Sequence, residues 1–169
     1  LLALAGSTNA VFHLIAMAGR RNITLPLSRF DELGQTTPFL VNLSPSGKHL
    51  MDAFHAAGGC PAVMNEIRDL LNLDCLTVTG ATVGDHLSKA RRYDRDVIRD
   101  RETALAPQGS IAVVRGNLAP SGAIIKVSAA SPHLLKHRGT AVVFQDYADM
   151  LARVNSPDLP VDACSVLVL

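Results

Sequence analysis

The sequence has few aromatic residues, no tryptophan and almost no excess of charge. Aromatic side chains make up 4% of the residues, too few to build a surface on which nucleic-acid bases stack. The 16 basic side chains are balanced by 15 acidic ones, for a formal net charge of +1. We therefore expect neither nucleic acid nor an anionic membrane as a partner. No apolar run approaches the roughly 18 residues that cross a bilayer, and the apolar start lacks the basic flank of a secretion signal.

Cysteine is also scarce. Cys60, Cys75 and Cys164 are an odd number, and no pair has the C-x-x-C spacing. The odd count and the spacing argue against a disulfide scaffold, and we expect a reducing cytoplasm. The spacing also does not resemble a run that binds an iron–sulfur cluster, so we interpret the three residues as small buried hydrophobes.

What the chain does contain is enough apolar sequence for a folded core. It has 169 residues, 48% of them apolar and 18% charged, with a mean hydropathy of +0.22, which excludes a disordered tail. The chain opens on Leu1 and stops in an uncapped apolar run that ends at Leu169. Complete domains usually finish in polar residues, so we expect the sequence to be an internal fragment of a longer protein.

Apolar spacing and turn residues predict alternating helices and strands, hence an α/β fold. The first part, up to about residue 105, mixes the two, and the second is rich in short β-branched runs. The segment 89–102 interleaves opposite charges at high density and predicts a solvated face or linker. We place a domain boundary near residue 105. Helices are predicted at residues 8–21, 48–57, from Pro61 onward, 82–91 and 147–154, with one turn at 28–33, and strands at 39–43, 76–79, 111–114, 123–127, 141–144 and 166–169.

Two motifs partly match known ligand-binding patterns, a phosphate-binding loop and a zinc site, but each lacks residues that the pattern requires. The run 44–48 (SPSGK) approaches a phosphate-binding loop but lacks the first glycine, and His49 stands where a Ser or Thr is needed. We interpret it as a turn whose amides cap the next helix, although helix amides could still hold a carboxylate. His133 and His137 are four residues apart, as zinc ligands can be, but no third ligand is nearby, and they indicate an ordinary helix end.

The most informative polar cluster is Ser7, Thr8 and Asn9, which follow Gly6 and lead into an apolar helix. Small polar residues at this place can cap the helix or present hydroxyls and amides to a ligand. The residues alone leave both interpretations open.

Six strings in order give the sequence a family resemblance. They resemble the dihydroxy-acid dehydratase and phosphogluconate dehydratase family, and the resemblance covers essentially the whole chain. Three further strings, 128–132, 137–144 and 166–169, are more similar to the branch that dehydrates sugar acids such as arabinonate or xylonate. The alternative within the family is dihydroxy-acid dehydratase of branched-chain amino-acid biosynthesis. The six strings are 5–10 (AGSTNA), 42–48 (NLSPSGK), 57–64 (AGGCPAVM), 76–80 (LTVTG), 111–120 (IAVVRGNLAP) and 122–126 (GAIIK).

The resemblance implies loss of water from a 2,3-dihydroxy acid to give a 2-keto-3-deoxy acid. It implies two cofactors, an iron–sulfur cluster of the [2Fe–2S] rather than the [4Fe–4S] type and Mg²⁺, whose ligands lie outside these residues, as does the catalytic serine. No catalytic or metal-binding residue is therefore expected here, and Cys60, Cys75 and Cys164 are not ligands. Ser7, Thr8 and Asn9 are expected to face the substrate or to support residues that do.

The family fold implies that residues 1–105 end an N-terminal α/β domain and that 106–169 begin a swivelling β-barrel-like domain. It also implies a homodimer or tetramer in the whole protein. The isolated chain is expected to be inactive, and the rival interpretation is a non-catalytic scaffold or interface segment. Ala5 stands where the family commonly has a glycine. If that position needs a positive φ, Ala5 strains the loop.

Overall fold

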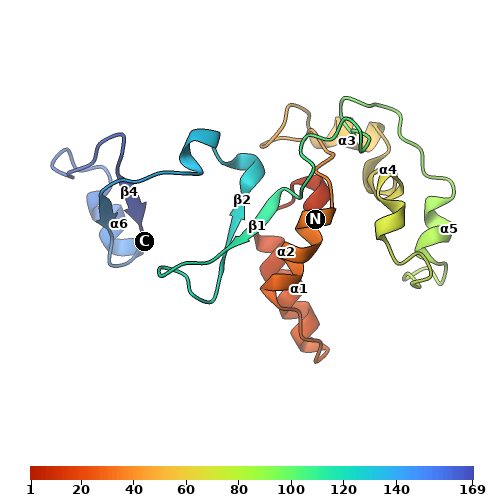
Figure 1. Cartoon of the computed structure of the whole chain (residues 1–169), viewed down its shortest axis with the longest axis horizontal. Helices are drawn as coiled ribbons and strands as arrows, with labels where there is room; N and C mark the ends of the chain where they lie inside the picture. Colours follow the sequence, from red (N-terminus) through yellow and green to blue (C-terminus); the bar gives the residue numbers. More distant parts are fainter. The chain divides into compact units, whose positions relative to one another are not determined.

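The computed structural model describes residues 1–169, which form two compact units, Leu1–Ala129 and Ala130–Leu169. Helices and strands are both present, as the α/β prediction requires, but every strand lies after residue 110 (Figure 1). No helix is both long and apolar enough to cross a membrane. The first unit contains α1 (Asn9–Arg20), α2 (Leu27–Thr36), α3 (Met51–Ala56), α4 (Gly59–Glu66), α5 (Val83–Leu87), β1 (Ile111–Val114) and β2 (Ala123–Lys126). The second contains β3 (Ala141–Val143), α6 (Tyr147–Arg153) and β4 (Val166–Val168).

Helices α1 and α2 share a small apolar core with the β1–β2 hairpin. Val11, Phe30 and Ile111 are buried in it, one from each of α1, α2 and β1. Strands β1 and β2 pair antiparallel, with Ile111 opposite Lys126, and Figure 1 shows β1 beside α2. Gly109 permits the close approach, because its N–H donates to the carbonyl of Gly34 at 2.7 Å and an added Cβ would lie 3.2 Å from the Gly34 Cα.

The larger core of the first unit forms around two extended segments, one with Leu40 and Val41 and the other with Val97 and Ile98. Leu40, Val41 and Ile98 are completely buried, and burying each such side chain contributes roughly 2 to 3 kcal/mol. The N–H of Asn42 donates to the carbonyl of Val97 at 2.9 Å, and Val41 forms an antiparallel bridge with Ile98. The predicted strand at 39–43 is thus buried as expected, but it is paired only by isolated bridges, so no ladder forms.

The charged segment 89–102 is a solvated face, as predicted, at most of its charged side chains, which are exposed, but it is not a linker. Val97 and Ile98 belong to the larger core. The Arg92 side chain is only 12% exposed and lies 3.2 Å from a carboxylate oxygen of Glu66 and 3.6 Å from one of Asp100. The alternating charges therefore cover a buried apolar pair and attach the segment to the end of α4.

The predicted strand at 76–79 is also wrong. Leu76 makes one bridge, to Thr82, and the side chains of Leu76 and Val78 are exposed. Helix α5 follows directly, and Thr82 and Asp85 form its capping box, in which each side chain accepts a hydrogen bond from the other's N–H. The turn predicted at 28–33 is in fact the ten-residue helix α2.

The second unit is a β-α-β arrangement. Strands β3 and β4 are parallel, with Ala141 opposite Val166, and α6 lies between them in the chain. The Asp146 side chain caps α6 by accepting the N–H of Asp149, and the Arg153 guanidinium stands 5.1 Å from the Phe144 ring centroid. All four strands predicted after residue 105 are present, and each lies within one residue of its predicted bounds. The domain boundary near residue 105 stays a prediction.

Candidate functional site

Ser7, Thr8 and Asn9 lie at the start of α1. Ser7 and Asn9 are exposed and Thr8 is half-buried. The Ser7 hydroxyl accepts the N–H of Asn9 at 3.2 Å, whereas the side chain of Thr8, the N-cap residue, makes no capping hydrogen bond. Part of the cluster therefore stabilises the helix start, and the Thr8 hydroxyl and Asn9 amide stay available to another partner.

Ala5 precedes this cluster in a left-handed conformation. Its φ is +50° and its ψ is +46°, at the end of the single 3-10 turn Leu2–Leu4. Glycine adopts these angles readily and Asn and Asp do so occasionally. For other residues, such as alanine, the left-handed conformation costs roughly 1 to 2 kcal/mol. The backbone at this position therefore does have a positive φ, and Ala5 carries the strain that a glycine would avoid.

The loop 44–48 does not present its amides to an anion. The N–H of Lys48 donates to the Asn42 side-chain oxygen at 3.0 Å, and the N–H of Gly47 donates to the Leu43 carbonyl at 2.8 Å. An added Cβ on Gly47 would lie 2.5 Å from Asn42 atoms, so only glycine fits there. Since α3 begins later, at Met51, these amides do not cap it. The capping role predicted for these amides is therefore wrong.

Two contacts hold this loop against the rest of the first unit. His49 Nε2 lies 2.9 Å from a carboxylate oxygen of Asp96, and the Ser128 hydroxyl donates to the Ser46 hydroxyl at 3.2 Å. The hydrogen bond from His49, with smaller contributions from the charges of Arg99 and Lys48, lowers the pKa of Asp96. The carboxylate is therefore ionised at neutral pH and keeps the loop in place.

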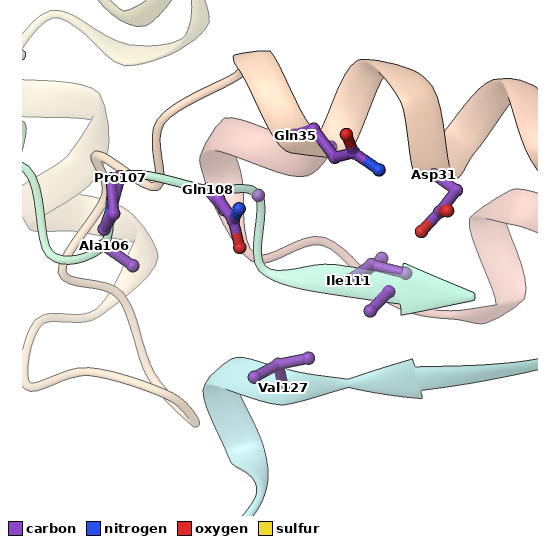
Figure 2. A pocket seen from close by; sticks show the side chains of 10 residues that line it. Asp31, Gln35, Ala106, Pro107, Gln108, Ile111 and Val127 are labelled. Atoms are coloured by element: carbon purple, nitrogen blue, oxygen red, sulfur yellow. The ribbon is translucent and has the colours of Figure 1, made fainter. Parts of the chain in front are cut away.

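A largely apolar pocket with three polar side chains, which the sequence did not predict, lies between α2 and residues 106–112. Figure 2 shows Asp31 and Gln35 leaving α2 on its β1 side, with Gln108 at one end. Asp31 and Gln35 share a helix face because they are four residues apart. The pocket has a volume of about 170 Å³, and one carboxylate and two carboxamides supply its polar side chains. Such groups bind hydroxyls, but no cationic side chain lines the pocket to hold an acid.

The cysteines and histidines do not form a metal centre. Cys60, Cys75 and Cys164 are free and all exposed, so the prediction that they are buried is wrong. No group of three or more His, Cys, Asp or Glu side chains is placed to hold a metal ion. His133 lies in a 3-10 turn, not an α-helix, and His137 donates through Nε2 to the Cys164 carbonyl at 2.9 Å. These residues do not fit an iron–sulfur cluster or a Mg²⁺ site.

Comparison with protein families accounts for both parts of the chain. Residues 1–86 match the N-terminal model of the dihydroxy-acid/6-phosphogluconate dehydratases, and residues 96–169 match the C-terminal model. The chain belongs to this dehydratase family. The gap between the two matches, residues 87–95, overlaps the charged segment 89–102, of which Val97 and Ile98 lie in the core of the first unit.

Three of the most similar relatives bear the names of sugar-acid dehydratases. The L-arabinonate dehydratase of Rhizobium leguminosarum bv. trifolii is 49% identical, over 99% of this chain and 29% of that protein. The L-arabonate dehydratase of Azospirillum brasilense is 48% identical over the same shares. The 6-deoxy-6-sulfo-D-gluconate dehydratase of Pseudomonas putida is 43% identical, over 99% of this chain and 30% of that protein.

Dihydroxy-acid dehydratases also match, at 41% to 48% identity, but over 85% to 94% of the chain. The chain spans less than a third of the length of all these relatives. What the relatives act on is therefore a guide to the whole protein and not a property of these residues alone.

Proposed function

We propose that these residues are part of a hydro-lyase that dehydrates an aldonic acid to a 2-keto-3-deoxy acid. The observation that carries this proposal is the similarity to dehydratases named for sugar acids, which extends over 99% of the chain. The dihydroxy-acid dehydratases cover less of it, and this difference favours the sugar-acid branch. An acid with five or six carbons and several hydroxyls is the substrate class proposed.

The reaction removes a proton from the carbon beside a carboxylate and a hydroxide from the next carbon. The carbon-bound proton is weakly acidic and hydroxide leaves poorly, so the reaction needs electrostatic stabilisation of both charges. The resulting enol takes up a proton to become the ketone. No side chain of this chain is assigned to either proton transfer, in line with a catalytic serine elsewhere in the whole protein.

The proposal includes an iron–sulfur cluster, of the [2Fe–2S] type, and Mg²⁺, both held by residues outside 1–169. In such an enzyme the two groups would supply Lewis acidity. A whole protein that contains the cluster should show its visible absorbance, whereas the 169-residue chain should show none. Cluster absorbance from the short chain alone would contradict this part of the proposal.

We further propose that Ser7, Thr8 and Asn9 face the substrate or support residues that do. The free Thr8 hydroxyl and the exposed Asn9 amide support this role, because both can bind hydroxyl groups of a sugar acid. The left-handed turn at Ala5 sets the direction in which the chain enters the cluster.

The proposed domain arrangement is the end of an N-terminal α/β domain, residues 1–105, and the start of a swivelling β-barrel-like domain, residues 106–169. The confinement of strands to residues after 110 supports it. The two sheets have only two strands each, and two-stranded sheets need further strands or packing for stability. A larger sheet in the whole protein would supply them, and we propose that the whole protein forms a dimer or tetramer.

The experiment that tests the function is a product assay with the whole protein. Incubation with L-arabinonate or D-xylonate should yield a 2-keto-3-deoxy acid, detected by mass spectrometry as loss of one water. Incubation with 2,3-dihydroxyisovalerate should yield no keto acid. Turnover of the branched acid alone would overturn the sugar-acid assignment, and turnover of neither would favour a non-catalytic scaffold.

A further inference from the structure

A groove on the first unit is lined almost entirely by apolar side chains. It has a volume of about 280 Å³, and its walls come from the start of the chain, from α1 and α2 and from residues 67–71. Three of its leucines, Leu14, Leu33 and Leu70, are 39%, 40% and 41% exposed. No charged side chain lines the groove, and Thr37 is its only polar residue. An uncharged cluster of partly exposed leucines is typical of a surface that another part of a protein covers.

The groove lies where the two apolar cores of the first unit meet. Leu2 and Phe30, which line it, belong to the small core formed with α1 and α2, whereas Ile67 belongs to the larger core. An apolar cavity of roughly 150 Å³ holds one benzene molecule, and this groove has nearly twice that volume. It therefore has room for about two large apolar side chains, and side chains placed there would contact both cores.

The family match indicates which part of the whole protein is available to cover the groove. All the residues that line it lie within 1–86, which match the N-terminal model, whereas residues 96–169 match the C-terminal model. The chain also spans less than a third of the length of its relatives. Any further part of the N-terminal domain therefore precedes Leu1 in the sequence of the whole protein.

The position of Leu1 favours a cover that is joined to it. Leu1 lines the groove, and its amino group is so far removed from water that burial lowers the pKa of that group. A peptide bond to a preceding residue would replace this charge with a neutral amide, which costs less to bury. A segment joined to Leu1 begins at the groove, so its effective concentration there is high. A second copy of the chain lacks this connection and must bury about 800 Å² per subunit to bind stably.

We propose that a segment preceding Leu1 in the whole protein packs large apolar side chains into this groove and so joins the two cores of the first unit. The segment shields Leu14, Leu33 and Leu70 from water, and their burial stabilises the N-terminal domain. This inference rests on the family match and not on the substrate, so it holds whichever acid the whole protein dehydrates.

The test is photo-crosslinking of the whole protein, produced with photoleucine in place of part of its leucine. Photoleucine keeps nearly the size of leucine, and on illumination it reacts with whatever group touches it, including water. Mass spectrometry then identifies the peptides joined to Leu33 and Leu70, and both should be joined to one stretch that precedes Leu1. Leu118 is 82% exposed and lies outside the groove, so it is the internal control and should not be joined to that stretch.

Three results would overturn the proposal. Crosslinks of Leu33 and Leu70 only to residues that follow Leu1 would assign the groove to another part of the same chain. Crosslinks found only in a band of twice the subunit mass would assign it to a second copy. Reaction of both leucines with water alone would show that the groove stays open in the whole protein. None of these results depends on turnover, so a failure of the sugar-acid assignment is distinguished from a failure of this inference.

Discussion

The side-chain amide of Asn42 donates a hydrogen bond to the backbone carbonyl of Asp96, at 3.2 Å and across 54 residues of sequence. The same side chain accepts the N–H of Lys48 at 3.0 Å. Asn42 is only 6% exposed, so water does not replace these partners. One buried side chain thus fixes the loop 44–48 and attaches it to the segment that contributes Val97 and Ile98 to the core.

We predict that Asn42→Ala lowers the free energy of unfolding of the first unit by about 1 to 3 kcal/mol, because it leaves a buried N–H and a buried carbonyl without partners. Urea unfolding followed by NMR signals of core residues measures the change. Asn117→Ala, at an exposed asparagine between β1 and β2, is the matched control and should stay within about 0.5 kcal/mol of the parent. Equal effects of the two substitutions would show that the Asn42 contacts contribute nothing.

A second prediction concerns the end of α1. Asn22 has a φ of +55°, and the N–H groups of Asn22 and Ile23 donate to the carbonyls of Gly19 and Ala18, the pattern of a Schellman motif. Asn22→Gly should stabilise the chain by about 0.5 kcal/mol, and Asn22→Val should destabilise it by about 1 to 2 kcal/mol, because a β-branched residue tolerates this conformation poorly. Thermal unfolding of the two variants measures both changes. A valine variant as stable as the glycine variant would contradict the left-handed turn.

The capping box of α5 predicts a dependence on pH. Hydrogen bonds from the Thr82 hydroxyl and then the Thr82 N–H lower the pKa of Asp85 below its ordinary value. The folded pKa is below the unfolded one, so this stabilisation is complete above the unfolded pKa, near 4, and is lost as the pH falls through the folded pKa.

Thr82→Val removes the hydroxyl, and the pKa of Asp85 should rise toward its ordinary value in a ¹³C NMR titration. The pKa of Asp96 depends on His49 instead, so it should not move in the same variant and serves as the internal control. An unchanged Asp85 titration would refute the assigned cause.

The proposed role of Thr8 can be tested in the whole protein. Thr8→Val removes a hydroxyl that makes no capping hydrogen bond, so we expect the melting temperature to change little. If that hydroxyl binds the substrate, kcat/KM for the sugar acid should fall by about tenfold, which corresponds to about 1.4 kcal/mol. Thr24→Val, at an exposed position beyond α1, should leave kcat/KM unchanged. A Thr8 variant with full activity would remove this residue from the substrate site.

Helices with a clear apolar stripe could be predicted from the sequence because the pattern is local. The predicted helix at 8–21 is α1 (Asn9–Arg20), and the one at 147–154 is α6 (Tyr147–Arg153). The glycine pair that begins at Gly58 ends α3 as predicted, with a φ of +113° at Gly58. An added Cβ there would lie 2.2 Å from the Arg91 carbonyl, so the stop signal also reflects a close contact that the sequence does not show.

The errors occur where a long-range contact decides the structure. Apolar residues at 39–43 indicate burial, but the sequence does not show that Val41 finds only Ile98 as a bridge partner. The charged residues around Val97 and Ile98 hide a buried apolar pair from sequence analysis, because the Arg92 guanidinium lies between the carboxylates of Glu66 and Asp100 only in the folded chain. The pocket between Asp31 and Gln108 joins segments far apart in sequence, and no local signal could have found it.

The most direct test of the account is the specificity of the whole protein, measured as kcat/KM for L-arabinonate, D-xylonate and 2,3-dihydroxyisovalerate under identical anaerobic conditions. The account predicts turnover of at least one sugar acid to its 2-keto-3-deoxy acid and none of the branched dihydroxy acid. Turnover of 2,3-dihydroxyisovalerate without turnover of either sugar acid would contradict it.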